Sequence, residues 1–121
     1  MAQILHVDDD PGIRKMFADV AEMLGHEVVS VSTANAAADV VRNGLNQEPP
    51  VLPALIVSDR HTGVDDDAVT TLTEELHDMN VKIPVVAFSS RTDTLPEGVI
   101  SLRKPADFDQ IEIAINHALE Q

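Results

Sequence analysis

The sequence contains no cysteine, no tryptophan and no tyrosine, and only three phenylalanines. Without cysteine the chain has no disulfide framework and no thiolate chemistry. With so few aromatic side chains, it also lacks the means to stack nucleic-acid bases. No stretch of about 18 or more residues is continuously apolar, so the sequence predicts no transmembrane helix.

Basic residues are scarce: the sequence has 8 lysines and arginines and 21 aspartates and glutamates, which gives a net charge of −13. Nonspecific binding to nucleic acid or to an anionic membrane needs clustered positive charge, so we expect neither partner. The first residues show no basic and then apolar signal region, which predicts a cytoplasmic protein. The length predicts one domain, residues 1–121.

The N-terminal part of the chain holds a short apolar run, residues 4–7, that ends in Asp8, Asp9 and Asp10. A run without polar alternation predicts a buried strand. In open α/β sheets, ligands bind where the strands end at their carboxyl side. An isolated acidic triplet is more often a solvated turn, so its role depends on what else reaches this edge.

Strand-like runs alternate with helical apolar patterns along the rest of the chain. Helices are expected to begin after Asp10, after Ser32 or Thr33, at residues 65–67 and after Asp107, and the first two to stop at Gly25 and Gly44. Strands are expected at residues 4–7, 27–31, 54–58, 84–88 and 99–102. This order predicts an α/β fold, a doubly wound five-stranded parallel sheet with helices on both faces.

One connection differs from the others. Residues 89–98 carry Pro96 and Gly98 and no helical apolar stripe. We predict a loop or at most one helical turn there, so that the fourth helix of the alternation is shortened or absent.

Side chains that can bind a metal or take part in a reaction follow four of the five strands: Asp8 and Asp9, Asp59, Ser89 and Lys104. Because the carboxyl ends of parallel strands share one edge, these residues should converge on one site. Carboxylates suit Mg²⁺, and a carboxylate can attack phosphorus to form an aspartyl-phosphate. A hydroxyl and an ammonium can hold the oxygens of a phosphoryl group during transfer.

These positions together resemble the receiver domain of bacterial response regulators. The resemblance spans the whole chain in order, with fitting spacing. The motifs that carry it are Val7-Asp8-Asp9, Asp59 after an apolar strand, Ser89 five residues after Pro84, and Lys104-Pro105. It implies a flavodoxin-like fold with strand order 2-1-3-4-5.

The resemblance also implies roles for individual residues. Asp59 would be the phosphoacceptor. Asp9, Asp59 and the backbone carbonyl of His61 would ligate Mg²⁺, with Asp8 acting mainly through water. Asp10 would then cap the first helix rather than bind the metal.

The hydroxyl of Ser89 would bond the phosphoryl group, and Lys104 would pair with it. The phosphoryl donor would be a histidine kinase or a phosphotransfer protein, and the output would be binding to a downstream protein target. Such a protein is no enzyme beyond catalysing its own phosphorylation and dephosphorylation.

The chain departs from the receiver pattern in three places, and the shortened or absent fourth helix is one of them. No proline follows within residues 59–63, and Ser101 stands where receivers usually carry the aromatic residue of their switch. An output that works through an aromatic switch therefore cannot operate as such. His61 and Arg91 occupy positions that tend to tune dephosphorylation in receivers, although either can be an ordinary solvated side chain.

Two other functions fit parts of the pattern. A receiver-like scaffold could keep the site and act without phosphorylation. A haloacid-dehalogenase-type phosphohydrolase could use Asp8-Asp9-Asp10 as its Asp-x-Asp motif, but Gly12 stands where that family needs threonine. Outside the site, His6 lies within the first strand and is expected to be a packed core residue rather than a ligand.

Overall fold

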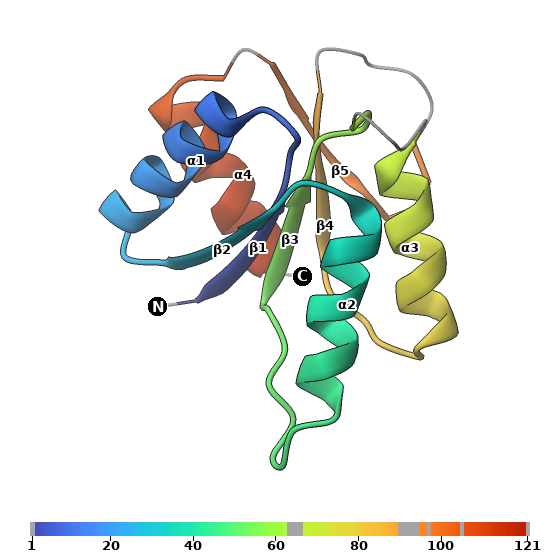
Figure 1. Ribbon diagram of the computed structural model, residues 1–121. Coiled ribbons are helices and arrows are strands. Elements are labelled where there is room, and N and C mark those ends of the chain that lie inside the picture. The colour runs from blue at the N-terminus through green and yellow to red at the C-terminus, as the bar shows by residue number, and fades with distance from the viewer. Residues whose placement is uncertain (1, 63–66, 90–94, 97, 105, 121) are drawn as a thin grey trace.

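The computed structural model describes residues 2–62, 67–89, 95–96, 98–104 and 106–120. Within these residues, the elements in chain order are β1 (Gln3–Val7), α1 (Pro11–Met23), β2 (Glu27–Val31), α2 (Ala34–Leu45), β3 (Leu55–Ser58), α3 (Ala68–Asp78), β4 (Val85–Ser89), β5 (Ile100–Arg103) and α4 (Phe108–Leu119). All strand pairs are parallel, in the order β2-β1-β3-β4-β5 (Figure 1). The predicted sheet and strand order are confirmed.

Helices cover both faces of the sheet, as the alternation of elements predicts. Helices α1 and α4 pack on one face and α2 and α3 on the other (Figure 1). In the part of the chain that the structure describes, no helix has both the length and the apolar character to cross a bilayer.

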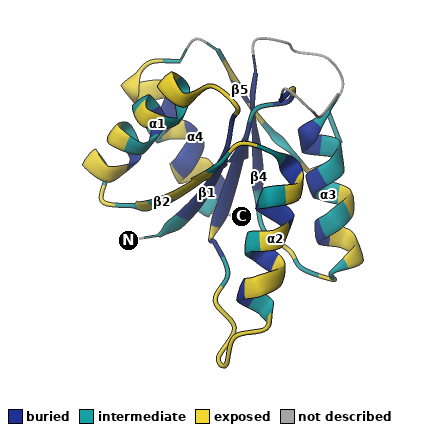
Figure 2. Ribbon diagram, viewed as in Figure 1, coloured by how far each residue is buried: buried dark blue, intermediate teal, exposed yellow. Residues whose placement is uncertain are grey.

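Burial along the strands explains their order in the sheet. Strands β3 and β4 are buried at every position, and β1 is buried at every position after Gln3. Strands β2 and β5, at the two edges of the sheet, contain several exposed residues, as Figure 2 shows for β2. The continuous apolar runs therefore form the centre, because only a strand covered on both faces gains from such a run.

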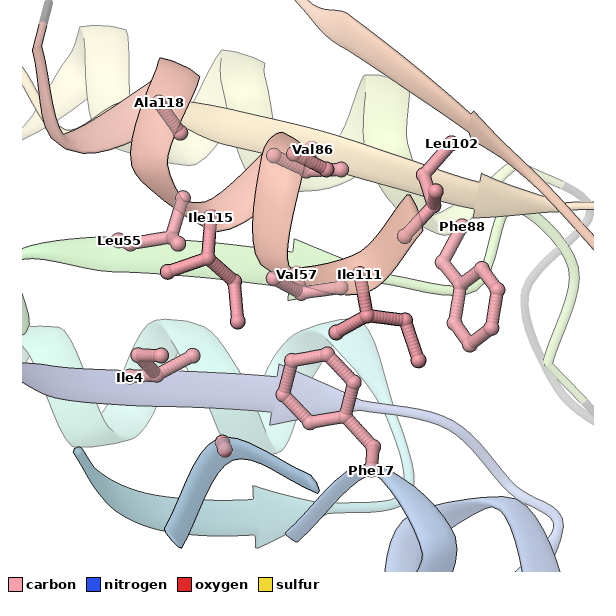
Figure 3. Packing of buried hydrophobic residues seen from close by; sticks show 12 residues of the cluster. Ile4, Phe17, Leu55, Val57, Val86, Phe88, Leu102, Ile111, Ile115 and Ala118 are labelled. Carbon is pink, nitrogen blue, oxygen red and sulfur yellow. The ribbon is translucent and has the colours of Figure 1, made fainter. Parts of the chain in front are cut away.

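The core on the α1 and α4 face is built around two aromatic rings. Phe17 of α1 and Phe88 of β4 are 0% and 1% exposed, with ring centroids 6.4 Å apart. Ile111 of α4 packs into the same layer over β1 and β3 (Figure 3). Burying an aliphatic or aromatic side chain of this size contributes about 1.5–3 kcal/mol. This layer fixes α1 and α4 beside the strands whose ends carry the acidic residues.

The helices begin at side chains that cap them. Asp10 accepts hydrogen bonds from the backbone N–H groups of Gly12 and Ile13, and Asp107 forms a reciprocal capping box with Gln110. Thr33 caps α2, which fixes one of the two candidates that the sequence offers. These caps confirm the expected helix starts, because their oxygens satisfy N–H groups that the first turn leaves unpaired.

Helix α2 continues one residue past the predicted stop at Gly44. The chain returns against this glycine, whose carbonyl accepts a hydrogen bond from the Val51 N–H at 2.9 Å. A Cβ on residue 44 would overlap the carbonyl group of Val51. Gly44 is thus required by a close approach of two backbone segments rather than by a helix end.

The connection between β4 and β5 is described only in part. Residues 90–94 and 97 lie outside the described residues, so the predicted loop is not followed there. In the described residues no helix lies between β4 and β5. A groove of about 620 Å³ lies between α3 and the amino ends of these strands, and Leu76, Val81 and Val99 line it.

His6 is a core residue, as the sequence predicts. It is fully buried and stacks on Phe17 with ring centroids 4.3 Å apart. Neither ring nitrogen has a hydrogen-bond partner among the described residues. Burial first, and then the positive charges of Lys104 and Arg14, lower the pKa of His6 to about 3. The fold therefore holds this imidazole neutral.

Replacing His6 should flatten the acid side of the stability profile. The unfolded chain binds a proton at His6 below pH 6.5, whereas the folded chain does so only near pH 3, so stability is lost as the pH falls through this window. Between pH 7.5 and 5.0 the wild type should lose about 2 kcal/mol more unfolding free energy than His6→Leu. Urea unfolding followed by circular dichroism, with a chelator present, measures the difference. Equal losses would contradict it.

Gly44→Ala should destabilise the protein by about 1–3 kcal/mol, because the added Cβ forces α2 and the Val51 segment apart. In a helix without such a contact, replacing glycine by alanine stabilises by about 0.5–1 kcal/mol. A lower urea midpoint for Gly44→Ala would confirm the backbone contact, and a higher one would contradict it. Asn43→Ala, at an exposed position of the same helix, is the control.

Candidate functional site

Three carboxylates meet at the carboxyl edge of the sheet. Asp8 follows β1 and Asp59 follows β3, and these strands are neighbours. Ligand oxygens of Asp8, Asp9 and Asp59 all lie within 4.8 Å of one another. The Asp59 N–H donates to the Val7 carbonyl at 2.7 Å, and the Asp8 N–H to the Val31 carbonyl at 3.1 Å. The sheet ladder thus continues one residue past each strand and sets the positions of both acids.

Lys104 brings a positive charge to this cluster. It follows β5, and its Nζ lies 2.9 Å from Asp8 Oδ2 and 3.4 Å from Asp59 Oδ1. The ammonium also sits 5.1 Å from the ring centroid of Phe88, a distance that suits a cation–π contact. The Lys104 N–H donates to the Ser89 carbonyl at 2.9 Å, which ties the backbone of Lys104 to the end of β4.

Asp8 is held on several sides. Its side chain is 1% exposed, Oδ1 accepts from the Asp10 N–H at 2.9 Å, and Oδ2 binds Lys104. The Asp8 backbone carbonyl accepts from Arg14 Nη1 at 2.7 Å. Asp9, by contrast, is exposed. Of these two acids, Asp9 is the one open to a ligand from solvent, while Asp8 already has a partner for each oxygen.

The pKa of the Asp59 carboxyl group is raised above its ordinary value. Burial is the largest cause, and the charge of Asp8 raises the pKa further. Lys104, by charge and hydrogen bond, and the backbone N–H of His61, which donates to the carboxylate, act in the opposite direction. The carboxylate is 14% exposed. Asp59 is therefore a partly desolvated anion that would gain from a further cation.

The remaining site residues of the sequence prediction are distributed as follows. Ser89 is buried at the last position of β4, next to Arg103 in the neighbouring strand. The side chain of His61 is exposed, and its contact with the site is the N–H donated to Asp59. Arg91 lies outside the described residues. The structure therefore brings Asp8, Asp9, Asp59 and Lys104 into one cluster, with Ser89 and His61 adjoining it.

Sequence reasoning missed two arginines beside the site. Arg14 reaches back from the first turn of α1 to the Asp8 carbonyl. Arg60 is 8% exposed, and its Nε and Nη2 each lie 3.3 Å from Asp67 Oδ2. The signal for Arg14 was its place one helical turn after the acidic triplet. Arg60 gives no such signal, because three consecutive aspartates, residues 65–67, lie near it in the sequence and nothing singles out Asp67.

The donor set fits a hard divalent cation. Oxygen ligands from one or two carboxylates, completed by water and phosphate oxygens, are what Mg²⁺ requires. Two of the three carboxylates lie at least partly open to solvent, and their mutual repulsion favours a bound cation. An acidic site able to hold a metal ion is thus present at the predicted edge.

No protein-family model matches the sequence, and no curated protein matches it. Solved structures do. A response regulator receiver domain protein from Clostridium thermocellum is 22% identical with a TM-score of 0.81, over 99% of this chain and 95% of that one. The N-terminal domain of a response regulator/sensory box/GGDEF protein from Carboxydothermus hydrogenoformans is 24% identical, with a TM-score of 0.78 and coverages of 98% and 94%. The chemotaxis protein CheY4 of Vibrio cholerae is 20% identical, with a TM-score of 0.78 and 98% of both chains covered.

These likenesses establish that the chain has the fold of response regulator receiver domains, over nearly its whole length. The expectation drawn from the site motifs is confirmed at the level of the fold. What the site does has to be argued from the residues of this chain.

Asp59→Asn should raise the thermal unfolding midpoint at pH 7 in the presence of a chelator. The folded-state pKa of Asp59 is raised, so its favourable contribution to stability exists below its ordinary value of 3.8 and is lost as the pH rises through the folded pKa. The neutral amide avoids this loss. Circular dichroism at pH 7 and at pH 3.5 measures it, and the advantage of the amide should vanish at the lower pH.

The matched control is Asp19→Asn, an exposed aspartate on α1 that pairs with Lys15 at 3.2 Å. Its replacement should change stability by less than about 0.5 kcal/mol at either pH. A lower midpoint for Asp59→Asn at pH 7 would show that the contact with Lys104 outweighs the desolvation of the carboxylate.

Proposed function

We propose that this chain is the phosphoacceptor receiver of a two-component, or phosphorelay, signalling system, phosphorylated on Asp59 in a Mg²⁺-dependent reaction. The observation that carries the proposal is Lys104, whose ammonium lies between Asp8 and Asp59 at the carboxyl edge of the sheet. A desolvated carboxylate, two acidic neighbours and one fixed cation form a site suited to phosphoryl transfer. The receiver fold of the chain supports the same function.

In the reaction, a carboxylate oxygen of Asp59 forms a bond to phosphorus while the bond from phosphorus to the donor's histidine nitrogen breaks. The electron pair of that bond remains on the imidazole. Lys104, already 3.4 Å from Asp59, pairs with an oxygen of the incoming group, and the Ser89 hydroxyl bonds another. Asp8 keeps Lys104 in place through its contact at 2.9 Å.

The metal would be held by Asp9, Asp59 and the backbone carbonyl of His61, with Asp8 acting mainly through water. When bound, Mg²⁺ neutralises the charge that accumulates on the phosphoryl oxygens. Asp10 stays outside this set, because its side chain caps α1.

The phosphoryl donor would be a histidine kinase or a phosphotransfer protein in the cytoplasm, and the output would be binding to a downstream protein. The protein catalyses at most its own phosphorylation and dephosphorylation. A phosphohydrolase of the haloacid-dehalogenase type is disfavoured, because Asp10, the second acid of its Asp-x-Asp motif, is occupied as the cap of α1.

Incubation with acetyl phosphate and Mg²⁺ tests the function. The intact mass should increase by one phosphoryl group, and peptide mapping should locate it at Asp59. Asp59→Asn and chelation of Mg²⁺ should each abolish the increase. Lys104→Ala should slow it by about 100-fold, since it removes a charge aimed at the developing anion.

Arg42→Ala serves as a control, because it also removes one positive charge. The ion pairs of Arg42 with Asp39 and Glu75 lie on α2 and α3, away from the site. Its phosphorylation rate should equal that of the wild type. A wild-type protein that gains no mass under any Mg²⁺ concentration would instead be a phosphorylation-independent scaffold. Continuous release of phosphate that depends on Asp8 rather than on Asp59 would identify a phosphohydrolase.

A further inference from the structure

We propose that Arg60 and Asp67 form a clamp that positions the phosphoacceptor Asp59. This role rests on the proposed function of Asp59 and adds two positioning residues to it. Neither residue belongs to the motif through which the chain resembles receivers, and neither is placed in contact with the phosphoryl group.

The ion pair is partly buried and has a defined geometry. Two nitrogens of the Arg60 guanidinium, Nε and Nη2, each lie 3.3 Å from the same oxygen, Asp67 Oδ2. The Arg60 side chain is 9% exposed and the Asp67 side chain 30%. Such a pair differs from a surface ion pair, because removing one partner leaves a charge in a place that water reaches poorly.

The same two residues are also joined through their surroundings. The backbone carbonyl of Arg60 accepts from the Ala68 N–H at 2.6 Å. The second oxygen of Asp67, Oδ1, accepts from the Thr70 N–H at 3.1 Å and caps α3. One carboxylate therefore ties the first turn of α3 to the residue that directly follows Asp59. The backbone bond holds the same two segments together.

The clamp reaches the phosphoacceptor through one peptide. Arg60 lies between Asp59 and His61, and the His61 N–H donates to the Asp59 carboxylate. On its other side, Asp59 is anchored by its own N–H to the Val7 carbonyl. When Arg60 is held in place, the His61 N–H stays directed at the Asp59 carboxylate. The backbone carbonyl of His61, which would bind the metal, is held in place as well. Groups that orient ligands in this way commonly change metal affinity when they are mutated.

Three variants separate the clamp from the helix cap. Arg60→Met keeps the length of the side chain and removes its charge. Asp67→Ser keeps a capping oxygen for α3 and removes the ion pair. Arg60→Lys keeps the charge but loses the two-nitrogen contact, so it should restore part of the function. Arg42→Met, which breaks ion pairs on α2 and α3 away from the site, is the control.

The first measurement needs no metal. In the presence of a chelator, amide hydrogen exchange followed by nuclear magnetic resonance reports the protection of the His61 N–H. Arg60→Met and Asp67→Ser should each speed its exchange by about tenfold or more relative to the global rate, as expected for a local loosening. Arg42→Met should leave it unchanged. Unchanged exchange in both clamp variants would overturn the proposal, whatever their effect on stability.

The second measurement is Mg²⁺ affinity by calorimetry, followed by the rate of phosphorylation from acetyl phosphate at saturating Mg²⁺. Each clamp variant should bind Mg²⁺ about 10–100-fold more weakly. Adding Asp67→Ser to Arg60→Met should weaken Mg²⁺ binding no further, because Arg60→Met has already broken the Arg60–Asp67 contact. Wild-type affinity in the clamp variants would contradict the positioning role. A wild type that neither binds Mg²⁺ nor accepts phosphoryl would refute the proposed function, and the exchange measurement would still decide on the clamp.

Discussion

The site depends on one ammonium group among carboxylates. Two like charges about 4 Å apart repel by about 4 kcal/mol at the effective dielectric constant of about 20 that suits such pairs. Asp8, Asp9 and Asp59 bring three such charges within 4.8 Å, in a chain whose net charge is already −13. Lys104 offsets part of this repulsion for the two carboxylates it touches. The lysine reaches them because β5 runs parallel to β4 and ends at the same edge, so the sheet order and the charge balance depend on each other.

Much of the fold could be predicted from the sequence, because the signals involved are local. Continuous apolar runs distinguish strands that are covered on both faces, and β3 and β4 are such strands. Asp10 and Asp107 are residue types whose side chains satisfy the first N–H groups of a helix, and both do so. The convergence of Asp8, Asp59 and Lys104 follows from topology alone, since parallel strands present their ends on one side.

The contacts that could not be predicted are tertiary ones between polar groups. The sequence gives Arg60 three nearby aspartates and no reason to choose Asp67, because the choice depends on where α3 begins relative to β3. Gly44 reads as a helix end, yet it lies inside α2 because the Val51 segment returns against it. Likewise, the His61 N–H that contacts Asp59 belongs to the backbone, which side-chain patterns do not reveal.

The same contacts determine which neighbouring elements would respond to the proposed phosphorylation of Asp59. Phosphorylation adds negative charge to a side chain that carries one already, so it acts first on the cations and N–H groups around it. An aromatic residue cannot respond in the receiver manner, because Ser101 stands in its place and Phe88 is 1% exposed within the core.

Two connections remain within the described residues. Lys104 is bonded through its backbone to Ser89 at the end of β4, and Arg60 is bonded to the start of α3. Both lead away from Asp59, the proposed phosphoacceptor, one to the end of β4 and the other to the start of α3. Under the proposed phosphorylation of Asp59, we therefore expect the change to pass through these ion pairs and backbone hydrogen bonds rather than through a rotating aromatic ring.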